Sequence, residues 1–158
     1  MTGYRYELAR SLRHSLFDDP RTVLFVMLNP STADETTDDP TIRRCIGFAR
    51  SWGFTELRVA NLFAMRATDP RELRTAADPI GLGNDEALAR EIARAGLVVA
   101  AWGVHGTFLD RDRKVVAAHP ETRWTCVGTT RDGHPRHPLY VRADATAIPW
   151  SLPSRANP

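Results

Sequence analysis

Four short apolar segments of strand length constrain this chain most strongly. They cover residues Thr22–Leu28, Leu57–Phe63, Leu97–Trp102 and Arg123–Val127, and segments of helical length separate them. A continuous apolar run of this length is typical of a strand that is covered on both faces. Strands that alternate with helices favour a parallel sheet between two helical layers. The sequence therefore predicts a three-layer α/β sandwich with a central, mostly parallel four-stranded sheet.

Three helices are expected between these strands. The first runs from about Pro40 to Trp52, because Asp39 is a good N-cap residue and proline is favoured at the first helical position. The second is expected at Asp85–Ala95, with Asn84 as its N-cap. The third is expected at Val104–Ala118.

The two ends of the chain are expected to be peripheral. Residues Tyr4–Leu12 alternate loosely and could form an edge strand, and Leu139–Val141 could form a last short extended piece. A chain of 158 residues with 42% hydrophobic residues fits one globular domain, which we assign to residues 1–148. The proline-flanked segment 149–158 is expected to be a loosely packed tail.

Composition excludes several classes of protein. No apolar run approaches the roughly 18 residues of a membrane span, and the first residues lack the apolar stretch of a signal peptide. The two cysteines are too few for a disulfide framework, so we expect a cytoplasmic protein with no membrane partner. The net charge of +2 neither requires nor excludes a nucleic-acid partner.

Residues at the ends of the strands are the first candidates for a site, because ligands of parallel sheets bind beyond the carboxyl ends of the strands. Asn29 is held extended by Pro30, so its amide could position a water or read a polar ligand edge, or the pair could simply make a turn. Asn61 presents a donor and an acceptor, which suits the edge of an amide-like base, although a loop hydrogen bond is the alternative.

Other strand-end residues extend this set. Phe63 could stack on a planar ligand or pack in the core. Trp102 and Gly103 end the third strand, where a glycine permits close approach of the backbone to a ligand. Arg66 lies in an irregular segment and could pair with Asp69.

A loop stiffened by two prolines carries His134 and His137, and each imidazole offers a donor, an acceptor or a proton near neutral pH. The spacing of the two histidines allows a metal pair, but no third ligand is evident. No metal and no cofactor are therefore predicted. The chain also lacks the motifs of serine hydrolases, P-loop NTPases and zinc proteases.

An acidic loop precedes the first predicted helix and contains Asp34, Glu35, Asp38 and Asp39. Grouped carboxylates can bind a hard cation or carry out acid–base chemistry, and otherwise form a solvated loop. For Asp39, capping of the helix is the favoured interpretation.

Two basic residues, Arg43 and Arg44, lie in the first turn of the same helix, where cations oppose the helix dipole. This conflict indicates an anionic partner. Either the neighbouring carboxylates of the acidic loop or a phosphate at the helix end would serve, and the intramolecular pair is the simpler interpretation.

Several long strings of this sequence are similar to those of a known family. The strings MLNPSTAD, DDPTIRRCIGFARSWGF, NLFAMRATDP, AAWGVHG and HPLYV resemble the bacterial domain of unknown function 1643 family. The resemblance extends from about Tyr4 to Val141. It implies no particular reaction.

The order of strand-end residues also resembles, more distantly, the uracil-DNA glycosylase superfamily. The resemblance implies a glycosylase-like fold, with Asn29 orienting the attacking water and Asn61 reading the base edge. It implies that His137, or else His134, stabilises the departing base. The chain departs from the pattern at Leu139, where these enzymes usually carry serine.

The strand-end residues and the resemblance to glycosylases favour the hypothesis of N-glycosidic hydrolysis on a nucleobase in nucleic acid or in a nucleoside. The alternatives are a non-catalytic module that binds a nucleobase, nucleotide or nucleic acid, and a small-molecule hydrolase or transferase unrelated to nucleic acid. Asn29 and His137 are the candidate catalytic residues. Candidate substrate contacts are Pro30, Ser31, Asn61, Phe63, Arg66, Trp102, Gly103 and His134, and candidate phosphate contacts are Arg43 and Arg44.

Overall fold

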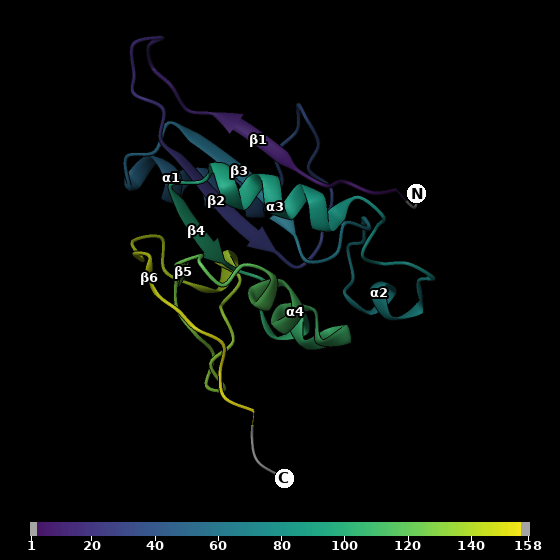
Figure 1. The fold of residues 1–158 in the computed structure, drawn as a ribbon. Helices are drawn as coiled ribbons and strands as arrows, with labels where there is room; N and C mark the ends of the chain where they lie inside the picture. The colour runs from purple at the N-terminus through teal and green to yellow at the C-terminus, as the bar shows by residue number, and fades with distance from the viewer. Residues whose placement is uncertain (1–2, 156–158) are drawn as a thin grey trace.

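A six-stranded sheet forms the centre of the computed structural model, which describes residues 3–155 (Figure 1). Its strand order is β1-β3-β2-β4-β5-β6. The strands are β1 (Leu8–Ser11), β2 (Thr22–Met27), β3 (Glu56–Asn61), β4 (Leu97–Ala100), β5 (Trp124–Cys126) and β6 (Ile148–Pro149). The four inner strands are parallel, and β1 and β6 pair antiparallel at the two edges. The predicted α/β class and mostly parallel sheet are confirmed, but the sheet has six strands rather than four.

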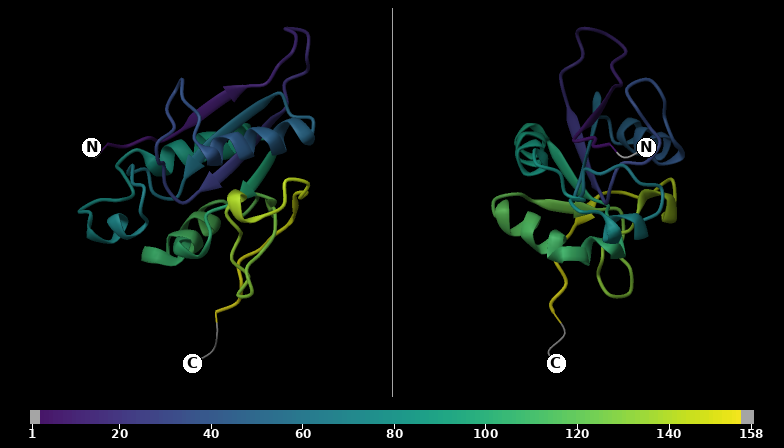
Figure 2. Two further views of the ribbon diagram at one scale, coloured as in Figure 1. Left: turned by 180° about the vertical axis from the view of Figure 1, so that it is seen from behind. Right: turned by 90° about the vertical axis from the view of Figure 1, so that its right-hand side faces the viewer.

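Side chains of β2 alternate between two cores, as the period of a strand requires. Val23 and Phe25 point to the core that α1 (Pro40–Ser51) covers. Leu24 and Val26 point to the opposite core, which α3 (Asn84–Arg94) and α4 (Arg111–Ala118) cover. Figure 2 shows the helices on the two sides of the sheet.

The first helix follows its sequence signals closely. Oδ1 of Asp39 accepts a hydrogen bond from the N–H of Ile42 at 2.8 Å, and Pro40 occupies the first turn. The stacked rings of Phe25, Phe48 and Trp52 fix this helix on the sheet, with centroids 5.2–6.3 Å apart.

The second predicted helix, α3, is present, but Asn84 does not cap it. The helix begins at Asn84 itself, and the side-chain Nδ2 donates to the carbonyl oxygens of Asn61 (2.9 Å) and Leu62 (3.0 Å). The asparagine therefore anchors the carboxyl end of β3. A further short helix, α2 (Arg71–Thr75), lies in the connection between β3 and α3.

The third predicted helix is broken. A 3-10 segment, η1 (Val104–Asp110), precedes α4, and Leu109 and Asp110 adopt left-handed backbone angles with φ of 55° and 57°. Near the end of the chain, a 3-10 turn η2 (Pro138–Tyr140) occupies the segment for which an extended piece was expected.

The C-terminal segment packs more closely than its composition indicates. Trp150 is 8% exposed, and its ring meets that of Trp102 edge-on with centroids 5.4 Å apart. Its indole N–H donates to the carbonyl oxygen of Gly133 at 3.0 Å. The packed domain therefore extends at least to Trp150. In residues 3–155, no helix combines the length and the apolar character that crossing a membrane requires.

Candidate functional site

A cavity of about 670 Å³ opens at the carboxyl edge of the parallel strands. It lies between β2 and β4, which are neighbours in the sheet although β3 comes between them in the sequence. Such a reversal of strand order is the usual ligand position in open α/β sheets. Its lining includes Asn29 after β2, Asn61 at the end of β3, Trp102 and Gly103 after β4, and His137 before η2. Ser31 lines it as well, so six of the candidate residues meet at one cavity.

The amide of Asn29 has a fixed orientation. Its Nδ2 donates to the carbonyl oxygen of Ala67 at 2.8 Å and to that of Pro30 at 3.0 Å. Because both amide hydrogens are used, Oδ1 remains as an acceptor in a cavity-lining residue. An acceptor held in this way can orient a water molecule.

Asn61 is the most unusual side chain of the site. It is 1% exposed, and neither Nδ2 nor Oδ1 has a hydrogen-bond partner within the described residues. Buried polar atoms are nearly always paired, so an unpaired donor and acceptor in a cavity wall indicate a ligand. The backbone beside it is fixed by Asn84 and by Arg111, whose Nε donates to Leu62 O at 2.8 Å.

His137 lines the same cavity, and its protonation is constrained by the adjoining turn. The N–H of Leu139 donates to Nδ1 at 3.2 Å, so the neutral imidazole carries its proton on Nε2. Burial lowers the pKa of His137, and the carboxylate of Asp39 opposes this effect more weakly. The ring is therefore a neutral donor at pH 7.

Three charged residues of the cavity lining, Arg5, Asp39 and Arg136, were not among the contacts expected from the sequence, and Nε of Arg136 donates to the carbonyl oxygen of Thr129 at 2.9 Å. Asp39 is 9% exposed and lines the cavity in addition to capping α1, and its Oδ2 accepts from the N–H of Ala33 at 3.3 Å. Arg5 lies in the segment before β1 and also lines the cavity. Its Nη1 donates to the carbonyl oxygen of Ala33. Burial, and then repulsion by Arg66, lowers the pKa of Arg5 to about 10, so it stays charged at neutral pH.

Trp102 and Gly103 shape the wall between the cavity and the core. Trp102 is 2% exposed and packs edge-on against Trp124 at 5.6 Å. Gly103 has φ of 73°, a backbone angle that glycine adopts without strain. A Cβ on Gly106 would lie 2.2 Å from Cδ1 of Trp102, so this glycine allows η1 to cross the indole face.

Several predicted contacts lie elsewhere. Phe63 is fully buried and packs against Phe108 with centroids 5.6 Å apart, so packing rather than stacking on a ligand is its role. Ser31 lines the cavity, whereas Pro30 is buried beside it and contributes its carbonyl oxygen to Asn29. His134 is absent from the lining, and its backbone N–H donates to the hydroxyl of Thr130.

The arginines of the first helical turn bind their own chain. Arg43 donates to the carbonyl oxygen of Asp38 at 3.0 Å, and Arg44 to that of Val141 at 2.8 Å. Neither lines the cavity. Arg66 lines an adjoining cavity instead and does not pair with Asp69, which binds Arg71 at 2.7 Å.

The acidic loop does not converge on a point. Asp38 pairs with Arg10 at 2.7 Å, Asp34 accepts from backbone N–H groups of its own loop, and Asp39 caps α1. Across residues 3–155, no three metal-ligating side chains gather. The loop is therefore stabilised by its own hydrogen bonds and caps the N-terminus of α1.

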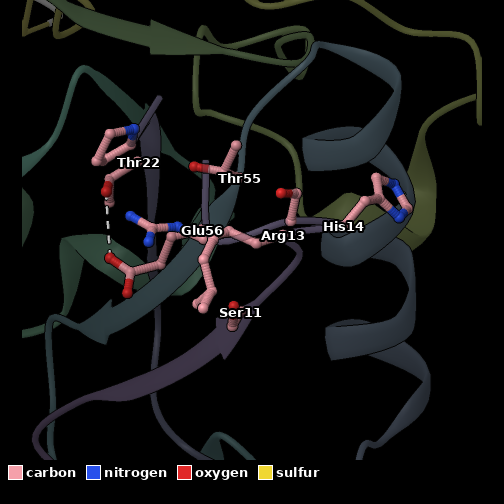
Figure 3. A pocket seen from close by; sticks show the side chains of 9 residues that line it. Ser11, Arg13, His14, Thr22, Thr55 and Glu56 are labelled. Atoms are coloured by element: carbon pink, nitrogen blue, oxygen red, sulfur yellow. Dashed lines mark hydrogen bonds between the residues drawn. The ribbon is translucent and has the colours of Figure 1, made fainter. Parts of the chain in front are cut away.

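A separate cavity of about 600 Å³ lies at the opposite edge, near the amino ends of β2 and β3 (Figure 3). Its side chains include Arg13, His14, Thr22 and Glu56, and the Thr22 hydroxyl bonds to Glu56 at 3.1 Å. None of the candidate residues lines it.

Comparison with known proteins gives one result. A family model described as "Protein of unknown function (DUF1643)" matches residues 5–139, which is most of the chain. No curated protein and no solved structure matches this sequence.

Proposed function

We propose that this chain, which belongs to the DUF1643 family of proteins of unknown function, is a glycosylase-like hydrolase. It would cleave the N-glycosidic bond of a nucleobase in nucleic acid or in a nucleoside. The distant resemblance of its strand-end residues to uracil-DNA glycosylases supports this reading, and the chemistry of the cavity supports it independently.

The unpaired amide of Asn61 carries the proposal. Leaving a buried donor or acceptor unpaired costs about 1–3 kcal/mol, so an empty cavity is unfavourable for this side chain. A nucleobase edge that presents an acceptor beside a donor would satisfy both atoms at once. An apolar ligand would satisfy neither.

The reaction would use three further side chains. The C1′–N bond would break and its electron pair would leave with the base. A water oxygen would bond to C1′, and the proton that this water loses would pass through solvent to the released base anion. Oδ1 of Asn29 would accept a hydrogen bond from that water and direct its lone pair at the sugar. Nε2–H of His137 would donate to the base oxygen where negative charge develops.

Asp39 would act on the sugar. It is the one carboxylate in the cavity lining within the described residues. The negative charge of this nearly buried side chain would stabilise the positive charge that develops on the sugar ring. Because its oxygens bond to two backbone N–H groups, its position is fixed before substrate binds.

Base release tests the proposal. Purified protein would be incubated with uracil-containing and modified DNA and with nucleosides, and free base would be measured. We expect release to fall about 10²–10³-fold in Asn29→Ala and in His137→Ala, in line with the loss of one hydrogen bond to the transition state in other enzymes. His134→Ala is the matched control and should keep native activity. Absence of release from every substrate would refute hydrolysis.

The second candidate is a non-catalytic module that binds a base or nucleotide. The observation in its favour is again Asn61, because pairing of its amide requires binding and no chemistry. Saturable binding without release, abolished by Asn61→Ala, would establish this alternative. If affinity for nucleic acid, nucleotides and bases were all absent at low salt, a small-molecule substrate would replace both candidates.

A further inference from the structure

Two arginines approach one side of the cavity from adjacent segments. The N–H of Arg5 donates to the carbonyl oxygen of Ala64 at 2.9 Å, and the N–H of Arg66 donates to that of Gly3 at 2.8 Å. Tyr4 and Met65 form the bridge between these bonds. The two arginines are therefore diagonal neighbours, and long side chains at such positions are within reach of each other.

Neither guanidinium has an acidic partner. Within residues 3–155, no carboxylate lies within ion-pair distance of Arg5 or Arg66, and Nε of Arg5 is buried without a hydrogen-bond partner. Neighbouring arginines differ in this respect, since Arg10 pairs with Asp38 and Arg58 with Glu91. The carboxylates of Asp39 and Asp34 raise the pKa of Arg5 from beyond ion-pair distance, but burial and the charge of Arg66 outweigh them, so an anion bound between the two guanidinium groups would be favourable.

The position of the pair connects two spaces. Arg5 lines the central cavity, and both arginines line an adjoining cavity of about 990 Å³ that opens toward β1. Four carboxylates also line the adjoining cavity, namely Glu7, Asp34, Glu35 and Glu86. Glu7 pairs with Arg90 at 3.6 Å, Asp34 is held by backbone N–H groups of its own loop, and none of the four pairs with either Arg5 or Arg66. An anion would thus bind at the junction, next to a base in the central cavity.

We propose that Arg5 and Arg66 form a subsite for the phosphate of a nucleotide. This rests on the proposed function, since it takes the neighbouring cavity to hold the base. It narrows the substrate to a base that carries phosphate, in a free nucleotide or within a strand, rather than a nucleoside. Guanidinium groups grip phosphate oxygens through paired N–H donors, and the unbonded donors of Arg5 and Arg66 suit that role.

Inorganic phosphate provides a test that needs no knowledge of the base. At constant ionic strength, replacing chloride by phosphate should raise the melting temperature of the native protein, because a ligand of the folded state stabilises it. The rise should disappear in Arg66→Gln and in Arg5→Gln. It should persist in Arg50→Gln, an exposed arginine of the last turn of α1. A rise that is absent in the native protein, or that persists in Arg66→Gln, overturns the subsite.

The source of the phosphate follows from a second measurement. Binding of deoxyuridine, deoxyuridine monophosphate and a short uracil-containing single strand would be compared for the native protein and the three variants. We expect the native protein to bind deoxyuridine monophosphate about tenfold more tightly than deoxyuridine. Arg5→Gln and Arg66→Gln should each lose that gain, while their affinity for deoxyuridine stays unchanged. A gain limited to the strand identifies an internucleotide phosphate. For the strand, Arg5→Gln and Arg66→Gln should each also reduce the slope of log affinity against log salt concentration by about 0.7. Equal losses in Arg50→Gln would refute the subsite.

These outcomes separate the two proposals. Phosphate-dependent binding without base release would retain the subsite and refute hydrolysis. Base release that is equal for nucleoside and nucleotide, and unchanged in Arg66→Gln, would retain hydrolysis and refute the subsite. Arg66→Gln decides the case if Arg5→Gln unfolds, because Arg5 also bonds to Ala33.

Discussion

At the scale of single residues, buried amides of this protein have opposite energetic roles. Nδ2 of Asn84 donates to two carbonyl oxygens and only its Oδ1 is unpaired, whereas Asn61 has no partner for either polar atom within the described residues. Both side chains are almost fully buried. The first stabilises the fold and the second destabilises it until a ligand binds.

This contrast gives a prediction for stability. Asn61→Leu should leave the free energy of unfolding unchanged or raise it by about 1 kcal/mol, because it removes two unpaired atoms. Asn84→Leu should lower it by about 1 kcal/mol or more, because it removes two hydrogen bonds. Urea denaturation of the two variants measures both effects. A large loss of stability in Asn61→Leu would show that its amide is paired in solution.

Histidine burial gives a prediction for pH dependence. Burial lowers the pKa values of His137 and His119 in the folded protein, so both rings resist protonation there. The unfolded chain therefore binds more protons below about pH 6.5, and stability falls as the pH decreases toward the folded values. His137→Asn should remove part of this fall and leave stability at pH 8 little changed. Denaturation at pH 8, 7, 6 and 5 provides the measurement. An unchanged slope would show that His137 is not desolvated.

At the scale of elements, the ends of strands and the starts of helices place the site. Residues 27–31 and residue 61 lie at one edge because β2 and β3 run parallel in register, with Met27 opposite Asn61. α1 begins at the same edge, so its N-cap Asp39 contributes to the cavity wall. One residue thus combines helix capping with a charge in the site.

Two glycines in helical segments should respond oppositely to alanine. A Cβ at Gly106 meets Trp102 at 2.2 Å, so Gly106→Ala should lower the free energy of unfolding by about 1–3 kcal/mol through overpacking. Gly47 in α1 is exposed with nothing within 4 Å, so Gly47→Ala should raise it by about 0.5–1 kcal/mol. Thermal or chemical denaturation distinguishes them. Equal effects would contradict the packing of η1 on Trp102.

At the scale of the whole molecule, one core depends on residues far apart in the chain. The rings of Trp124 and Trp150 each meet the ring of the cavity-lining Trp102 edge-on, with centroids 5.6 and 5.4 Å from it. They come from the end of β4, from β5 and from the segment after β6. The segment that follows β6 thereby supports the cavity wall through Trp150.

Removal of the last of these rings tests this arrangement. Trp150→Ala should lower the free energy of unfolding by about 3–5 kcal/mol, because it leaves a void beside Trp102 and frees the β6 edge. Ile148→Ala should have a much smaller effect, because Ile148 is 45% exposed. Urea titration of both variants measures the difference. A loss below about 1 kcal/mol would show that Trp150 is peripheral.

Sequence alone determined the parallel core and the edge at which the cavity lies. The residues of β2 are apolar on both faces, and this pattern is typical of a strand that lies between two layers of helices. Parallel strands end at the same edge of the sheet, so the sequence also predicted the edge where the cavity lies. Tertiary structure decided which polar groups face the cavity. Arg5 reaches it by pairing with a segment 59 positions later in the chain, at Ala64, and a local pattern contains no information on such a contact. The same holds for Asn84, whose neighbours in sequence favour a cap but whose neighbours in space are the carbonyl oxygens that end β3.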